Sequence, residues 1–175
     1  TTVGQIAYIY SGNTILLQDV IEDEVVGLQV YDYTRIDEFV IGDVVKITGT
    51  TGAFGGVSQV SKVTDIQVLG KKALFKPQEV TVKELLDNGR AFLSEYIVVK
   101  DAVLGKFVEN GSTPITDGTG TINIYKGPAY PSGVKEGDTV NVYAASSMHY
   151  ETVQLRMNAS SDFQVVKDEV GPEFV

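Results

Sequence analysis

The sequence contains one pattern twice, and the two copies lie about 95 residues apart. In each copy a Gly-Asp pair precedes a stretch in which every second residue is apolar, and a short segment ending in tyrosine stands upstream of that pair. The matching positions are 28–31 with 122–125, Gly42-Asp43 with Gly137-Asp138, Val45 with Val140, and Ile47 with Val142. Such self-similarity indicates one architecture used twice. The 175 residues are enough for two small domains.

Each copy is rich in short strand-like segments, in which apolar and polar residues alternate and which Gly, Asn and Asp separate. The expected strands are 3–10, 14–18, 27–33, 43–50, 57–61 and 63–69 in the first copy, and 96–107, 114–116, 120–126, 138–144, 151–157 and 162–167 in the second. Five or six strands in about 70 residues suit a small closed barrel better than a sandwich. We therefore predict an all-β protein of two tandem OB-fold-like five-stranded barrels with a short linking α-helix.

The linking helix is expected at about residues 82–88. Thr81 is a good N-cap, and Glu84 stands three residues later, which completes a capping box. Leu85 and Leu86 are expected to face a core, and a glycine follows as a stop signal.

The expected domains are residues 1–72 for the first barrel and residues 73–175 for the linker, the helix and the second barrel. The chain begins Thr1-Thr2-Val3, without Met or a charged leader. We therefore expect a mature or excised piece of a larger exported protein, with the export signal upstream.

The composition excludes several kinds of function. The net charge of −9 is spread along the chain, which argues against tight, non-specific binding of DNA or RNA, although a local basic groove stays open. The absence of Cys excludes disulfides and thiolate metal sites. No run of 18 apolar residues exists, so no transmembrane helix and no membrane insertion are expected. No cofactor is expected.

Three features suggest a chemical site, but each has a simpler explanation. His149 is the only histidine, which a Ser-His-Asp triad or most zinc sites would need, and it is expected in a solvated loop or against a ligand. Gly49–Gly56 lacks the Gly-Lys-Ser/Thr ending of a phosphate loop, so we expect a hairpin loop. Glu22-Asp23-Glu24 lacks EF-hand spacing and is expected to be an acidic turn, with bound calcium as the alternative. No catalytic residue and no metal ligand are assigned.

Aromatic residues mark the candidate binding faces. OB barrels bind oligonucleotides and oligosaccharides on the face of strands 2 and 3 and on neighbouring loops, where rings stack on bases or sugars. The candidate residues for weak ligand binding are Tyr31, Tyr33, Phe54, Tyr125 and His149. The alternative is that these rings cover the barrel or pack against the other domain.

Residues 114–125 read Pro-Ile-Thr-Asp-Gly-Thr-Gly-Thr-Ile-Asn-Ile-Tyr and precede Gly137-Asp138, while residues 80–85 form a short lead-in to the helix. This order resembles the tandem OB-fold modules of large secreted bacterial nucleases and nucleotide phosphoesterases, which are 5′-nucleotidase-like multidomain proteins. The resemblance implies a secreted or cell-surface bacterial location and a separate metallophosphoesterase or nuclease domain in the same parent chain. This segment would then be a non-catalytic accessory module that positions the substrate and binds nucleic acid or nucleotide weakly. The alternative is an architectural stalk or a protein- or carbohydrate-docking module on the bacterial surface.

We predict that the chain hydrolyses neither nucleic acid nor nucleotide phosphomonoesters, with or without added divalent metal. It has one His, no Cys and no metal-ligand pattern, so the groups that such hydrolysis needs are missing. Release of inorganic phosphate and of acid-soluble nucleotide measures this. Metal-dependent turnover that disappears when the carboxylates of this chain are replaced would contradict it.

Overall fold

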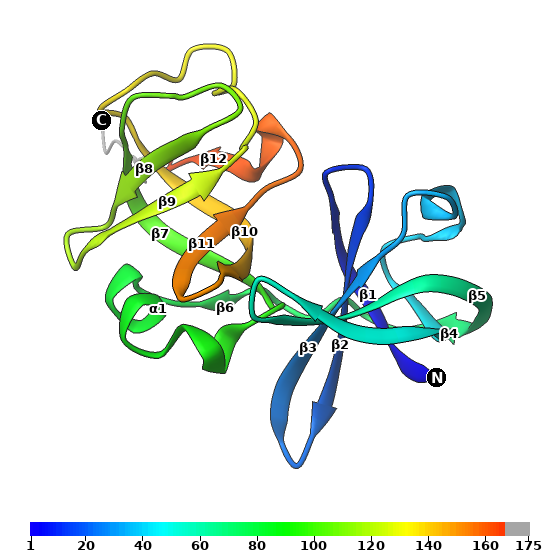
Figure 1. Cartoon of the computed structure of the whole chain (residues 1–175). Coiled ribbons are helices and arrows are strands. Elements are labelled where there is room, and N and C mark those ends of the chain that lie inside the picture. Colours follow the sequence, from blue (N-terminus) through cyan, green and yellow to red (C-terminus); the bar gives the residue numbers. More distant parts are fainter. Residues whose placement is uncertain (167–175) are drawn as a thin grey trace, which may run out of the picture.

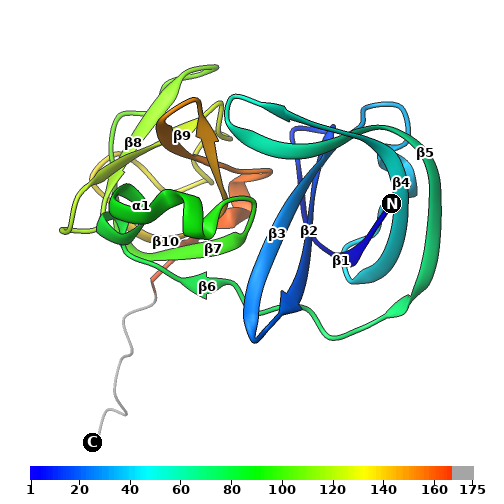
Figure 2. The same cartoon turned by 60° about the horizontal axis from the view of Figure 1, so that its bottom comes forward.

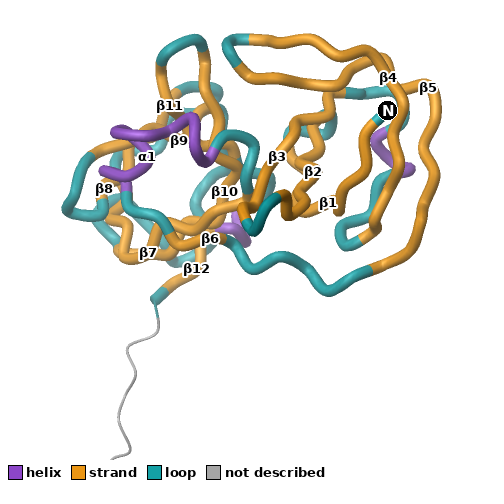
Figure 3. The backbone as a smooth tube through the Cα atoms, turned by 90° about the horizontal axis from the view of Figure 1, so that it is seen from below, coloured by secondary structure: helices purple, strands orange, loops and turns teal. Residues whose placement is uncertain are grey.

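The computed structural model of the chain describes residues 1–166. Figure 1 shows two β-barrels side by side, and Figure 3 shows that strands make up most of both. The predicted fold class is confirmed: the protein is all-β, with two closed five-stranded barrels and a short α-helix between them in the sequence. The domain boundary at residue 72 stays a prediction, and the end of the last expected strand, residue 167, lies outside the described residues.

The first barrel is built from β1 (Thr2–Tyr10), β2 (Thr14–Ile21), β3 (Glu24–Tyr31), β4 (Asp43–Phe54) and β5 (Val57–Lys71), with a 3₁₀ turn, η1 (Ile36–Glu38), before β4. The strands follow the order β1-β2-β3-β5-β4, and β4 pairs with β1 to close the barrel, which is seen end-on in Figure 2. The strands expected at 57–61 and 63–69 form one strand, because β5 pairs with β4 along its length and with β3 near its start.

The second barrel repeats this order with β7 (Tyr96–Leu104), β8 (Ser112–Thr116), β9 (Thr121–Tyr125), β10 (Thr139–His149) and β11 (Thr152–Arg156). β10 pairs with β7 to close it, and β11 pairs parallel to β9, as β5 pairs parallel to β3 in the first barrel. Two short strands, β6 (Gln78–Glu79) and β12 (Phe163–Val165), extend the sheet, and η3 (Ser160–Asp162) precedes β12.

The repeated apolar residues occupy corresponding places in the two barrels. Val45 and Ile47 lie on β4 opposite the first strand, β1, and both are fully buried. Val140 and Val142 lie on β10 opposite β7 and are likewise fully buried. Burying such a side chain contributes about 1.5–3 kcal/mol, so the sequence repeat reports positions on which each barrel core depends.

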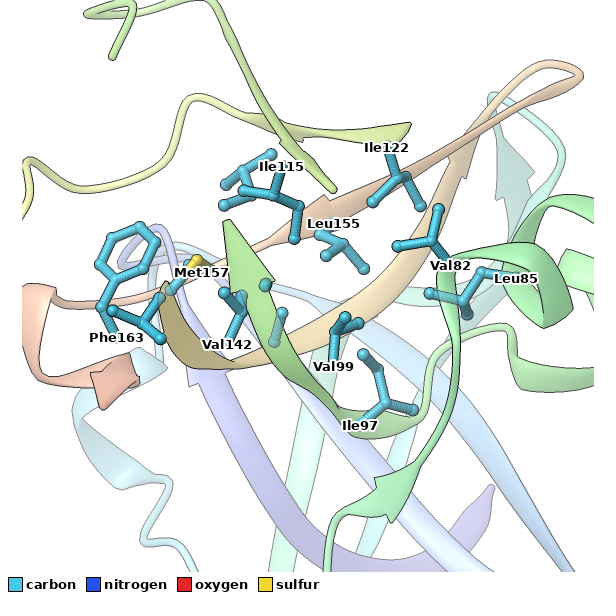
Figure 4. Close-up of a cluster of buried hydrophobic side chains, with 14 of the residues drawn as sticks. Val82, Leu85, Ile97, Val99, Ile115, Ile122, Val142, Leu155, Met157 and Phe163 are labelled. Atoms are coloured by element: carbon cyan, nitrogen blue, oxygen red, sulfur yellow. The ribbon is translucent and has the colours of Figure 1, made fainter. Parts of the chain in front are cut away.

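The helix α1 (Val82–Asn88) covers one end of the second barrel core. Its Val82 and Leu85 pack with strand residues of that core (Figure 4). The predicted capping box is confirmed: the Thr81 hydroxyl accepts from the Glu84 amide, and the Glu84 carboxylate accepts from the Thr81 amide. The predicted burial of Leu86 is wrong, since Leu86 is 47% exposed. Leu86 is four residues after Val82 and lies at the edge of the face that Val82 and Leu85 share, on the side away from Leu85. A 3₁₀ turn, η2 (Gly89–Phe92), follows the helix.

Tyrosines form the contact between the barrels. Tyr8, Tyr10 and Leu16 of the first barrel pack against Ala145 and Tyr96 of the second. The rings of Tyr8 and Tyr96 are stacked with centroids 4.6 Å apart. This small apolar cluster fixes how the barrels lie against each other.

Hydrogen bonds reinforce this contact. The Tyr8 hydroxyl donates to Asp162 Oδ2 at 2.7 Å and accepts from the Asn158 amide at 2.7 Å. Burial, together with the bond to Asp162, raises the pKa of Tyr8 well above its usual value, so the hydroxyl stays protonated. Gln18 Oε1 accepts from the Tyr96 amide at 2.8 Å. The Tyr8 hydroxyl and the Gln18 side chain are therefore paired across the contact.

Gly27 of β3 lies where the backbone of the first barrel touches the segment that leads into β7. A Cβ added at Gly27 would stand 2.0 Å from the Ser94 carbonyl oxygen and 3.0 Å from the Glu95 nitrogen. Real atoms do not approach so closely, so only glycine fits here without movement of one barrel.

We predict that Gly27→Ala destabilises the protein by about 1–3 kcal/mol, because the added methyl group overpacks the contact. The melting temperature should fall by about 2–4 °C for each kcal/mol. The matched control is Gly52→Ala on β4, where an added Cβ meets nothing within 4 Å. Equal melting temperatures for the two variants, measured by circular dichroism, would contradict the proposed close approach.

Candidate functional site

A cleft of about 450 Å³ lies between the two barrels. The first barrel supplies Tyr10, Asn13, Thr14, Gln29, Tyr31, Phe54, Val57 and Gln59 to its lining. The second barrel supplies Tyr125, Lys126, Ser147, Met148, His149, Gln154 and Arg156. The volume falls within the range of about 300–1,000 Å³ that is common for ligand sites.

The cleft uses the surface that OB barrels offer to ligands. In the first barrel the lining residues come from β2 and β3, from the loop that joins β1 to β2, and from the strand ends next to the β1–β2 and β4–β5 connections. Tyr10 ends β1, Phe54 ends β4, and Val57 begins β5. The β4–β5 turn is Gly55-Gly56, and both residues have positive φ. The Gly55 carbonyl accepts a hydrogen bond from the Tyr150 amide in the corresponding turn of the second barrel. The second barrel therefore closes one side of the binding face of the first.

The charge of the cleft differs from that of the whole protein. The chain carries 23 Asp and Glu residues, yet none of those within residues 1–166 lines the cleft. The lining contains Arg156, Lys126 and the only histidine, His149. The cleft is therefore suited to an anionic or neutral ligand within a protein of net charge −9.

Arg156 is held by both barrels. Its guanidinium carbon lies 5.4 Å from the ring centroid of Tyr10 and 5.4 Å from that of Tyr125. Its Nη2 donates to Ser11 Oγ at 2.9 Å, while its Nε is buried and has no hydrogen-bond partner within the described part of the chain. A guanidinium has five N–H donors, so Arg156 keeps donors for an anion in the cleft. Each ring contributes about 0.5–2 kcal/mol to holding it in place.

Amide side chains line the first-barrel side. The Tyr10 hydroxyl donates to Gln29 Oε1 at 3.4 Å, and Gln29 Nε2 donates to Gln59 Oε1 at 3.0 Å. Burial raises the pKa of Tyr10 to about 12, against the opposing effect of Arg156, so its hydroxyl is protonated at neutral pH. The chain of bonds leaves the Gln59 amide nitrogen as a donor toward the cleft.

Four of the five residues predicted from the sequence line this cleft: Tyr31, Phe54, Tyr125 and His149. The rings of Phe54 and His149 are 6.5 Å apart between centroids, across the boundary between the barrels. Tyr33 is outside the lining and 69% exposed, with its ring 6.4 Å from that of Tyr31. Ligand binding by any of the five stays a prediction.

The sequence did not single out Tyr10, Gln29, Gln59 or Arg156. Arg156 lies beside Tyr125 because Leu155 pairs with Ile124 in the parallel β9–β11 ladder, a pairing that only the structure shows. The contact of Arg156 with Tyr10 depends on how the barrels pack, and no local pattern reports it.

Solved structures with a similar fold match most of the chain at low similarity. The p204 HINb domain is 14% identical, with a TM-score of 0.45, over 89% of this chain and 91% of its own. A murine DNA-binding protein bound to double-stranded DNA is 16% identical, with a TM-score of 0.41, over 95% of this chain and 98% of its own. The Ifi202 HINa domain in complex with 20-base-pair double-stranded DNA is 11% identical, with a TM-score of 0.43, over 90% of this chain and 91% of its own. Neither a family model nor a curated protein sequence matches the chain.

The predicted resemblance to modules of secreted nucleases and nucleotide phosphoesterases is wrong, because the structures found are HIN domains, a different OB-fold family. The predicted accessory role beside a catalytic domain is therefore wrong as well, and the surface stalk or docking alternative has no support. The predicted secreted or cell-surface bacterial location rested on that resemblance and has no other support. The location of the protein stays a prediction. The structures found are described as DNA-binding or HIN domains, and the expectation that this segment is not an enzyme stays a prediction.

The other candidate features are structural. Glu22 and Asp23 form the β2–β3 turn, where both have positive φ. No group of three or more His, Asp or Glu residues within residues 1–166 is arranged to hold a metal ion. In the same range, no helix has the length and hydropathy to cross a membrane.

A second, smaller cleft of about 270 Å³ lies beside the β2–β3 hairpin and contains Glu95. Glu95 is 3% exposed, and its Oε2 has no hydrogen-bond partner among the described residues. Burial raises the pKa of Glu95 to about 7. Glu24 and Arg90 are the other charged residues of this cleft.

We predict that Glu95→Gln stabilises the protein above pH 7 and has little effect near pH 4. In the unfolded chain Glu95 loses its proton near its usual pKa of 4.5, whereas the folded protein retains it up to about 7, so stability falls as pH rises between the two values. The amide of the Glu95→Gln variant does not ionise, so the variant does not lose stability over this pH range. Thermal melts at several pH values measure it, with Glu24→Gln at the exposed edge of the same cleft as control. A pH-independent difference between Glu95→Gln and the parent would contradict it.

Proposed function

We propose that this chain is a non-catalytic nucleic-acid-binding module and that the cleft between its barrels is the binding site. The observation that carries the proposal is the lining itself: among residues 1–166 it contains two cations, several aromatic rings and four amide side chains, and no carboxylate. Cations and rings together are the means by which OB-fold proteins hold nucleic-acid strands.

Exposed rings support this function. Tyr31 is 38% exposed, and Phe54 is 64% exposed although phenylalanine is usually buried. Tyr8, Tyr10 and Tyr96, in contrast, are used in the contact between the barrels. Exposed rings beside a guanidinium provide flat surfaces on which bases stack, about 1–3 kcal/mol for each base.

The charge distribution limits the affinity. Only Arg156 and Lys126 in the cleft carry a full positive charge, so few phosphates are neutralised. Binding is therefore modest, and the slope of log affinity against log salt is shallow, about −1.4 to −1.8 for two phosphates. Two of the three similar structures described above are complexes with double-stranded DNA.

We predict that Lys126→Gln weakens binding of a fluorescein-labelled 12-nucleotide DNA about fivefold at low salt, because one phosphate contact is lost. The slope against salt should become shallower by about 0.7–0.9. Fluorescence anisotropy at several salt concentrations measures both, with single-stranded and duplex probes tested in parallel. Arg156→Gln should have an effect in the same direction.

The control is Lys135→Gln, which removes the same charge from a side chain that is 81% exposed and outside the cleft. It should leave affinity and slope nearly unchanged. If neither DNA probe binds, or if the Lys126 and Lys135 variants are indistinguishable, the cleft is not a nucleic-acid site.

A further inference from the structure

The two walls of the cleft differ in chemistry. Both full cations, Arg156 and Lys126, belong to the second barrel. The first barrel supplies two exposed rings, Tyr31 and Phe54, and the Gln29–Gln59 amide pair. A ligand that matches both walls has an anionic group on one side and a flat polar ring on the other.

The size of the cleft limits how much of a nucleic acid enters. At about 450 Å³ it has the size of a site for a small molecule. A duplex keeps its bases stacked inside and presents only their edges in the grooves. The rings of Tyr31 and Phe54 can stack only on a base whose face is open, so a paired base does not use this wall.

We infer that the cleft holds an unpaired nucleotide, with its base against Tyr31 and Phe54 of the first barrel and its phosphate toward Arg156 and Lys126 of the second. This inference rests on the proposed nucleic-acid function and specifies its ligand.

The hydrogen bonds in the cleft agree with this orientation. Gln29 Nε2 donates to Gln59 Oε1, which leaves the Gln59 amide nitrogen to donate to a base acceptor. Asn13 Oδ1 already accepts from the Thr14 hydroxyl at 2.7 Å, so the Asn13 amide nitrogen is likewise a donor. Donors on the first-barrel wall meet ring nitrogens and carbonyl oxygens of the base, while the cations meet the phosphate.

The experiment compares four probes by anisotropy or by competition with the labelled strand. They are a 12-nucleotide oligothymidine, a blunt-ended duplex, an abasic strand with the same number of phosphates, and an uncharged oligosaccharide. Oligothymidine should bind most tightly. The duplex should bind at least about tenfold more weakly, because a base must leave the stack first. The abasic strand should also bind about tenfold more weakly than oligothymidine. The oligosaccharide should not compete with the labelled strand.

Variants locate the base. Tyr31→Ala should weaken oligothymidine binding between about fivefold and about a hundredfold, and Tyr31→Phe should retain most of it, because stacking needs the ring and not the hydroxyl. The matched control is Tyr33→Ala, whose side chain lies outside the cleft and should change the affinity less than about twofold. Melting temperatures of all three variants check that they are folded.

The outcomes separate this inference from the proposed function. If the duplex binds as tightly as the strand, or the abasic strand as tightly as oligothymidine, the ligand is not an unpaired nucleotide although the chain still binds nucleic acid. If Tyr31→Ala and Tyr33→Ala have equal effects, the base is not at the Tyr31 wall. If no nucleic acid binds and the oligosaccharide does, both proposals are wrong.

Discussion

The stacked rings of Tyr8 and Tyr96 fix the geometry on which the candidate site depends. They join the barrels at a centroid distance of 4.6 Å, and the buried hydroxyl of Tyr8 is paired with Asp162 and the Asn158 amide. A buried polar group stabilises a contact only where its partners are present, so this arrangement tolerates little sliding of one barrel over the other. The cleft walls come from different barrels, and this contact sets the distance between them.

The cleft also shows why net charge is a poor guide to binding in a two-barrel protein. The acidic side chains lie elsewhere, on turns such as Glu22-Asp23 and in exposed ion pairs such as Lys83–Asp87. In the lining, Arg156 lies between Tyr10 and Tyr125 rather than beside a carboxylate. Its charge is therefore not neutralised by a partner in the lining.

The sequence predicted the barrels and the helix but only part of the site. Apolar and polar residues alternate after Gly42-Asp43 and after Gly137-Asp138, which indicates strands with one inward, apolar side. The repeat therefore predicts the residues of both barrel cores. Tyr31 and Tyr125 could be predicted as outward-facing residues, because successive residues of a strand point to opposite sides and the inward residues were known. The contact between Arg156 and Tyr10 could not be predicted from the sequence, because it depends on how the two barrels pack against each other.

The family resemblance failed for a related reason. Its motifs are turns and core positions, such as those of residues 114–125, and any OB barrel needs such residues whatever it binds. Function depends instead on the residues that face the cleft, which those motifs do not include.

The hydrogen bond between the Tyr150 amide and the Gly55 carbonyl has a consequence for how this protein can change over time. It ties the same turn of each repeat copy to the other, next to the cleft. A longer turn in one copy would push the barrels apart or occupy the cleft unless the other turn became shorter. The two copies therefore cannot diverge independently at this position, and the duplicated barrel has become half of a single unit.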